Sequence, residues 1–168
     1  VASEREARAV SRARKEYMQR FFPFIELQCA RKPNRVILDA PSGNGDIAQA
    51  LSRSLPNSRI LALDLNPYMA AVSREKLDSR HTVLVGDIRN LATLVRSNVD
   101  IILCLNGFHQ YTADKERFLA DGYGLLRVGG RFLFDVSARG LFSKATRDFM
   151  NTWERAIHRL ARRRGTRY

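Results

Sequence analysis

The sequence predicts an α/β fold in which helices cover a doubly wound, mostly parallel β-sheet. The first observation is the segment Val36–Gly45, VILDAPSGNG, where a branched apolar run ends in an acidic residue and a glycine-rich turn. The next residues, Asp46–Leu55, have the apolar spacing of a helix, which makes the segment a strand, a tight turn and a helix. The second observation is that apolar runs and helical patterns alternate along the chain. Such alternation favours parallel strands with right-handed crossovers.

The third observation is the set of residues at the expected strand ends. Four successive strands end at or next to Asp39, Asp64, Asp87 and Asn106. The carboxyl ends of parallel strands meet at one edge of a sheet, and such sheets bind their ligand there. The sequence therefore predicts a ligand site at that edge.

Five strands and their connections follow from this pattern. The expected strands are Val36–Asp39, Arg59–Leu63, Thr82–Val85, Val99–Leu105 and Arg131–Val136. The expected connections are the helices Asp46–Leu55, Pro67–Leu77 and Asp114–Leu126, and a short helix or turn at Leu91–Arg96. Asn66 precedes Pro67 as a helix cap, and Gly129-Gly130 is expected to end the last of these helices before the fifth strand.

The glycine turn has the features of a nucleotide site. Gly43 and Gly45 allow bare backbone to approach a ligand, and the following helix directs N–H groups toward it. Asp64 lies about 20 residues further on, the spacing of a carboxylate that accepts hydrogen bonds from ribose hydroxyls.

The composition is that of a globular chain in a reducing compartment. It is 45% hydrophobic and 27% charged. No apolar run approaches the roughly 20 residues of a membrane span, and the charged N-terminus lacks the apolar part of a signal peptide, so a cytoplasmic location is expected. Cys29 and Cys104 are expected to be free buried thiols, and no Cys-x-x-C pair or Cys/His cluster predicts a metal site.

The net charge of +12 is high for a small enzyme. The basic residues concentrate in Arg5–Arg20 and Lys144–Arg167. This pattern favours a nucleic-acid or acidic partner, although each segment can equally be the solvated face of a helix.

The ends of the chain carry helical patterns of their own. Ser3-Glu4-Arg5-Glu6 is a capping box that begins a helix to about Arg20, and Pro23 separates it from a short helix to about Ala30. Leu141–Arg163 is a basic amphipathic helix. We expect one domain, residues 1–168, with an N-terminal helical cap (1–34), a cofactor-binding core (35–136) and a C-terminal basic helix (137–168).

These motifs together resemble the class I S-adenosylmethionine-dependent methyltransferases, over about Arg35 to Val136. VILDAPSGNG is similar to the first motif of that family, with Pro41 where the family has its first turn glycine. LALDLN, VGDIRNL, DIILCLNGFHQY and LLRVGGRFLFDV resemble the motifs that follow it, with Val128 where the last one usually has proline. The resemblance implies a Rossmann-like sheet of strand order 3-2-1-4-5 and S-adenosylmethionine as the cofactor.

The resemblance also implies roles for single residues. Asp64 would hold the two ribose hydroxyls, Asp87 the adenine amino group, and the Ile88 backbone an adenine ring nitrogen. The remaining cofactor-binding residues would be Asp39, Pro41, Gly43, Gly45, Leu65 and Asn106. A carboxylate has two acceptor oxygens, which suits a vicinal diol.

Some of these residues have a second interpretation that the sequence leaves open. Asp39 either contacts the cofactor amine or orients the turn through backbone N–H groups. Asp87, after a glycine, is also typical of an ordinary turn, and Asn106-Gly107 is a common turn pair.

His109 and Tyr111 are the candidate catalytic residues. The substrate pocket is expected over Asn106–Tyr111, roofed by the N-terminal helices. A base is needed only if the accepting atom must lose a proton, and a lone histidine near a strand end is more often packed or supporting. His81 and His158 are expected at the surface.

The fourth motif bears on the methyl acceptor. Asn106-Gly107-Phe108-His109 lacks the Pro-Pro-aromatic run that follows Asn or Asp in enzymes that methylate base amines, which favours a small-molecule acceptor. The alternatives are an RNA-directed methyltransferase, and a non-catalytic methyltransferase-like module that binds a partner through its basic helices. A nicotinamide dehydrogenase is a weaker alternative, because the Asp87 and Asn106 motifs do not belong to it.

The family usually continues past the fifth strand with a helix and two more strands. Here a basic helix follows and the sequence stops, so the sheet is truncated, or the remainder lies outside this sequence, or the helix covers the sheet edge. The sheet edge or the C-terminal helix is a candidate homodimer surface.

Overall fold

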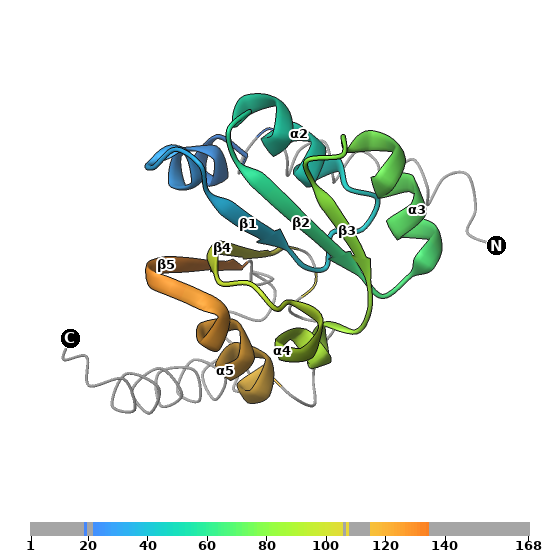
Figure 1. Ribbon diagram of the computed structural model, residues 1–168, viewed down its shortest axis with the longest axis vertical. Coiled ribbons are helices and arrows are strands. Elements are labelled where there is room, and N and C mark those ends of the chain that lie inside the picture. Colours follow the sequence, from blue (N-terminus) through green and yellow to red (C-terminus); the bar gives the residue numbers. More distant parts are fainter. Residues whose placement is uncertain (1–18, 20–21, 106, 108–114, 135–168) are drawn as a thin grey trace.

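The computed structural model describes residues 19, 22–105, 107 and 115–134, which form a five-stranded parallel sheet with helices on both faces (Figure 1). The strands are β1 (Val36–Asp39), β2 (Arg59–Asp64), β3 (Thr82–Val85), β4 (Val99–Cys104) and β5 (Leu126–Phe134). The helices are α2 (Asp46–Ser54), α3 (Pro67–Lys76), the 3₁₀ turn η1 (Ile88–Asn90), α4 (Leu91–Leu94) and α5 (Lys115–Leu125). The strand order β3-β2-β1-β4-β5 confirms the order expected from the sequence.

The sheet separates two apolar layers. Helices α4 and α5 lie on one side, and α2, α3 and the helical residues 22–30 lie on the other (Figure 1). Successive residues of a strand face opposite sides, so Leu38 and Ile102 pack with the first layer and Ile37 and Ile101 with the second. Both faces of the central strands are therefore buried, which explains their near-continuous apolar sequences.

Residues 22–30 form the short second helix expected near the N-terminus. Ile25 and Cys29 bury against the same apolar layer as α2, so this segment is one of the helices that cover the sheet. Cys29 and Cys104 are both buried and form no disulfide with each other, as expected. Burial raises the pKa of the Cys29 thiol to about 12, which leaves it protonated and unreactive at neutral pH.

The start of β5 differs from the expectation. Gly129-Gly130 does not end the preceding helix: α5 stops at Leu125, and the strand begins at the next residue. Leu126 pairs with Val99 and Arg131 pairs with Ile101, so four residues of β5 bulge between two successive pairs of the ladder. Gly129 has φ +76° in this bulge, a conformation that glycine adopts at little cost.

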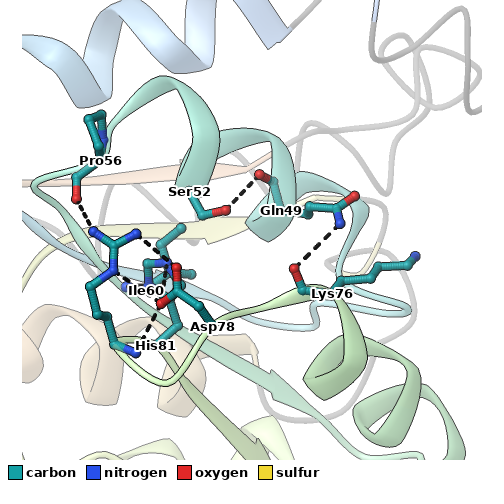
Figure 2. A network of polar contacts seen from close by, with 8 residues as sticks. Gln49, Ser52, Pro56, Ile60, Lys76, Asp78 and His81 are labelled. Carbon is teal, nitrogen blue, oxygen red and sulfur yellow. Dashed lines mark hydrogen bonds and ion pairs between the residues drawn. The ribbon is translucent and has the colours of Figure 1, made fainter.

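His81 is the second correction, because the sequence analysis placed it at the surface. Its side chain is fully buried, and Nδ1 accepts a 3.2 Å hydrogen bond from the Ile60 N–H at the amino end of β2 (Figure 2). The backbone donor of Ile60 needs an acceptor there, and the imidazole supplies it. Burial lowers the pKa of His81 below 6.5, so the ring is neutral at physiological pH.

The other expected boundaries agree within two residues, except that η1 precedes α4. The expected helices Ser3–Arg20 and Leu141–Arg163 lie outside the described residues, Gln19 apart, as does His158. Among the helices that the structure describes, none has the length and apolar character needed to cross a membrane.

Candidate functional site

The turn after β1 is attached to the two strands on either side of it. The Ala40 N–H donates to Leu103 O on β4 at 2.9 Å, and the Ser42 N–H donates to Leu63 O on β2 at 2.9 Å. The Ala40 bond continues the β1–β4 ladder directly beyond the end of β1, and the Ser42 bond ties the turn itself to β2. The turn is therefore held at the carboxyl edge of the sheet, between its two neighbouring strands.

Two glycines give the turn its shape. Gly43 and Gly45 have φ values of +55° and +76°, in the left-handed region that other residues rarely adopt. Gly45 is also the N-cap of α2 and packs on α3: a Cβ at this position would lie 2.4 Å from Ser73 Oγ. Gly45 is therefore required both by the backbone conformation and by the close approach of the two helices.

Asp64 ends β2 and accepts hydrogen bonds from two backbone donors. Its Oδ2 accepts from Gly43 N–H at 2.7 Å, and its Oδ1 accepts from Asn66 N–H at 2.9 Å. Asn66 in turn caps α3 by accepting from Tyr68 N–H at 2.9 Å, as its position before Pro67 predicts. The carboxylate is partly exposed at the edge of the sheet, so it joins the glycine turn to β2 and still faces solvent.

The turn contains buried polar groups at its base. Asp39 is 1% exposed beneath the turn, which fits its interpretation as a residue that orients the turn. The Ser42 Oγ and Asn44 Oδ1 atoms are also buried, and within the described part of the chain neither has a hydrogen-bond partner. Buried polar atoms of this kind need an explanation, and a ligand in the turn would provide one.

Pro41 lies against the segment after β4. A Cβ at Gly107 would lie 2.3 Å from the Pro41 ring carbons Cγ and Cδ, so these two backbone segments are in direct contact. The contact brings the first and fourth motifs together. The sequence analysis placed Gly107 in a turn pair and in the fourth motif, and did not predict its contact with Pro41.

Apolar side chains next to Asp64 are exposed to solvent. Leu65 is 58% exposed, and Tyr68 and Met69, in the first turn of α3, are 71% and 36% exposed. The sequence predicted Leu65 as a contact and did not predict the other two. Apolar surface beside a carboxylate suits a ligand that has both a flat apolar ring and hydroxyl groups.

Asp87 and Ile88 follow β3 at the same edge. The Gly86 N–H donates to Asp64 O at 3.0 Å, which ties the third motif to the second. Ile88 is 2% exposed, and its side chain packs in the apolar layer that contains Leu38 and Ile102. Asp87 caps η1 by accepting from Arg89 N–H at 2.9 Å, and Arg89 hydrogen bonds hold the pKa of this carboxyl below its ordinary value.

The remaining predicted site residues, Asn106, His109 and Tyr111, lie outside the described residues. The structure thus brings eight of the predicted positions to one edge of the sheet, in the turn and at the strand ends: Asp39, Pro41, Gly43, Gly45, Asp64, Leu65, Asp87 and Ile88. Arg89 and Ser73 were missed. An Asp-x-Arg sequence after a strand, and a small residue on the helix facing a glycine turn, are the signals that point to them.

Residues 37–130 match the family described as a methyltransferase domain, which covers more than half of the chain. The chain belongs to the class I S-adenosylmethionine-dependent methyltransferases. The match begins in β1 and ends in the bulge of β5, so it contains the turn, Asp64 and Asp87. S-adenosylmethionine is accordingly the cofactor of the family to which this site belongs.

Curated methyltransferases are similar over much of this chain. The demethylmenaquinone methyltransferase of Thermotoga maritima is 29% identical over 133 residues, which are 77% of this chain and 56% of that protein. The ubiquinone/menaquinone biosynthesis C-methyltransferase UbiE of Stutzerimonas stutzeri is 32% identical over 131 residues, 72% of this chain and 50% of that protein. The chain thus spans about half the length of the curated relatives it matches.

A solved structure with the same fold is a TehB-like SAM-dependent methyltransferase from Corynebacterium glutamicum. Its TM-score is 0.63, with 21% identity, and the match covers 88% of this chain and 83% of that one. At this identity the likeness concerns the methyltransferase fold alone.

Proposed function

We propose that the chain provides the cofactor-binding core of an S-adenosylmethionine-dependent methyltransferase that acts on a small-molecule acceptor. The observation that carries the proposal is the pair of carboxylates, Asp64 and Asp87, at neighbouring strand ends. The backbone bond from Gly86 to Asp64 joins these ends, and the glycine turn lies on the other side of Asp64.

Asp64 would hold the ribose of the cofactor. Each of its oxygens accepts one backbone N–H, and a carboxylate oxygen has two lone-pair positions. One position on each oxygen therefore remains for a hydroxyl, so the carboxylate can bind a vicinal diol without releasing the turn.

The adenine ring would lie between the ends of β2 and β3. Asp87 would accept from its amino group, the Ile88 backbone would bind a ring nitrogen, and Leu65 would offer apolar surface to the ring. Gly43, Gly45 and Pro41 would shape the turn around the rest of the cofactor, with Asp39 orienting it from beneath and Asn106 at the end of β4. The unpartnered Ser42 Oγ and Asn44 Oδ1 fit a ligand that bears polar groups at this point.

The bound cofactor supplies a methyl group on a positively charged sulfur. Transfer is an in-line displacement, so the contribution of the protein is to hold the two reactants in line and to exclude water. His109 and Tyr111 remain the proposed catalytic residues. One of them is needed as a base only where the accepting atom loses a proton.

The names of the relatives support a small acceptor with a flat ring, because demethylmenaquinone is such a molecule. The RNA-directed and non-catalytic alternatives rest on the net charge of +12. A homodimer through the sheet edge or the C-terminal helix, and a cytoplasmic location, also stay predictions.

The first test is calorimetric titration of the chain with S-adenosylmethionine, S-adenosylhomocysteine and NAD. We expect the two sulfur nucleosides to bind and NAD to fail. Binding of NAD alone would replace the proposal with the dehydrogenase alternative.

The second test concerns the acceptor. The chain is incubated with radiolabelled cofactor and either a reduced demethylated naphthoquinone or RNA, and label is expected in the quinone. Label in RNA alone would support the RNA-directed enzyme. A gel shift with RNA that is strong at low salt and weakens steeply at high salt, without any methyl transfer, would support the binding module.

A further inference from the structure

Strand β3 has the same turn at each of its two ends. Before the strand, Arg80 donates its N–H to Asp78 Oδ1 at 3.0 Å and its Nε and Nη2 to the same carboxylate at 3.1 and 2.8 Å. After the strand, Arg89 donates its N–H to Asp87 Oδ1 at 2.9 Å, its Nε to Asp87 Oδ2 at 2.8 Å, and its Nη2 to that same oxygen. Both are Asp-x-Arg sequences in which the arginine covers the preceding carboxylate.

The two turns differ in their surroundings. Asp78 lies at the amino edge of the sheet, with 52% of its side chain exposed, near His81 and Pro56 (Figure 2). The Arg80 guanidinium also donates to Pro56 O at 2.6 Å, so its role there is to hold a loop. Asp87 lies at the carboxyl edge beside Asp64, and only 16% of its side chain is exposed.

The acceptor positions of Asp87 are largely taken. Its Oδ1 accepts the backbone N–H of Arg89, and its Oδ2 accepts two guanidinium donors. Two donors fill the lone-pair positions of one carboxylate oxygen. One position on Oδ1 therefore remains, whereas an amino group that approached Oδ2 would have to replace a guanidinium hydrogen bond.

We propose that Arg89 competes with the adenine amino group for Asp87 and thereby sets how tightly and how selectively the site binds adenosyl compounds. The inference rests on the proposed function, which makes Asp87 the acceptor for that amino group. The Arg89 side chain is 56% exposed, so a ligand at this edge of the sheet can reach its ion pair with Asp87. The wild type then binds the ligand more weakly by the free energy of the Arg89–Asp87 ion pair that the ligand disrupts.

The Arg89 side chain can be replaced without removing the backbone hydrogen bond that caps the turn. The turn is capped by the backbone N–H of Arg89, which every side chain at this position retains. Replacing the guanidinium therefore removes the competitor and keeps the capping bond. Methionine keeps the length of the apolar stem without the charge, so Arg89→Met is the variant of choice.

The experiment is calorimetric titration of the full chain with S-adenosylhomocysteine. We expect Arg89→Met to bind about two- to fivefold more tightly than the wild type, the amount expected from loss of an exposed ion pair. Arg80→Met is the matched control and should bind as the wild type does. Raising the salt concentration should bring the wild type closer to Arg89→Met, because salt screens the ion pair.

A second ligand tests selectivity. S-inosylhomocysteine carries a carbonyl where adenine carries its amino group, and a carbonyl accepts from a guanidinium instead of competing with it. Arg89→Met should therefore bind this analogue less well than the wild type does, so that its preference for the adenosyl ligand increases. In an Asp87→Asn background, Arg89→Met should no longer increase adenosyl affinity, because the asparagine amide forms no ion pair with the arginine.

The failure of this inference is distinguishable from failure of the proposed function. If the wild type binds S-adenosylhomocysteine and Arg89→Met binds it equally or more weakly while its thermal unfolding is unchanged, Arg89 does not compete. If Arg89→Met is also less stable, its effect in the Asp87→Asn background decides between the two roles. The same loss of affinity there as in the wild type would mean that Arg89 acts only by supporting the fold. If the wild type does not bind the nucleoside at all, the proposed function is itself wrong.

Discussion

The Asp64 carboxylate accepts a 2.7 Å hydrogen bond from the backbone N–H of Gly43, 21 residues earlier in the chain. The end of β2 thus holds the turn that follows β1. Asp64 is a structural residue in the free protein as well as the proposed ribose ligand, and a substitution there acts on both properties.

Asp64→Ala should therefore lower both affinity and stability. We expect the affinity for S-adenosylhomocysteine to fall at least tenfold, about 1.4 kcal/mol, because the diol loses its acceptors. We also expect the free energy of unfolding to fall by about 1–3 kcal/mol, since Gly43 N–H loses a charged acceptor. Calorimetry and urea unfolding measure the two effects.

Asp100→Ala is the control, because Asp100 has the same structural role at the opposite edge. Its Oδ2 accepts from Val36 N–H at 2.8 Å, at the start of β1, and pairs with Arg127 at 2.7 Å. This variant should lose a similar free energy of unfolding with unchanged affinity for the nucleoside. Equal losses of affinity in both variants would mean that Asp64 acts only through the fold.

Leu65→Ser should weaken nucleoside binding without affecting stability. The side chain is already 58% exposed in the free protein, so serine removes apolar surface that only a ligand would cover. We expect a loss of about three- to tenfold in calorimetric affinity. Val128→Ser, at a position 95% exposed in β5, should change neither property. An unchanged affinity in Leu65→Ser would place the ring elsewhere.

Gly45→Ala should destabilise the protein for two separable reasons. The residue has φ +76°, and its new Cβ would lie 2.4 Å from Ser73 Oγ and 2.9 Å from Ser73 Cβ. We expect a loss of about 1–3 kcal/mol in urea unfolding. Adding Ser73→Gly should recover most of the steric part, since only the 3.1 Å contact with the Cα of residue 73 remains, and should leave the conformational part.

Gly124→Ala is the matched glycine substitution for Gly45→Ala. Among the residues that the structure describes, none has an atom within 4 Å of a Cβ built at this position, which lies in α5. Alanine should stabilise this helix by up to about 1 kcal/mol. If Gly45→Ala were equally harmless, the turn would have a different backbone conformation from the one described here.

His81→Gln should make the free energy of unfolding depend less on pH between about 5 and 7. Burial, the larger cause, lowers the pKa of His81 below 6.5, while the nearby Asp78 raises it. The unfolded chain therefore binds a proton near pH 6.5 that the folded chain does not, and the stability contribution is lost as the pH falls from about 7 to 5.

The measurement is urea unfolding of both proteins between pH 5 and 7.5. The wild type should lose more stability than His81→Gln toward the acid end of this range. Asp78 does not contribute to the difference, because hydrogen bonds from Arg80 lower its pKa to about 2 and it stays ionised throughout. Parallel curves for the two proteins would mean that His81 titrates normally in the folded state.

The expected elements that agree with the structure are those whose signals are local. The cap Asn66, the helix α3 and the strand β3 depend on patterns within a few residues of sequence, and they occur as expected. The strand order came from the resemblance to a family, which contains information on the whole sheet.

The differences arise where a distant partner decides the outcome. Gly129-Gly130 has the sequence of a helix terminator, but pairing with β4 places it inside a bulge of β5. His81 follows a polar turn and is buried nevertheless, because Ile60 N–H requires an acceptor. The contact between Arg89 and Asp87 is local, and the sequence analysis missed it although both residues lie in one Asp-x-Arg sequence.

The two backbone bonds from Ala40 and Ser42 to the neighbouring strands mean that the turn has its final shape before any ligand arrives. These two amide hydrogens should exchange with heavy water only when the whole sheet opens, at the same low rate with or without nucleoside. Binding would then need no slow rearrangement of the main chain, and mixing experiments should show a single fast phase.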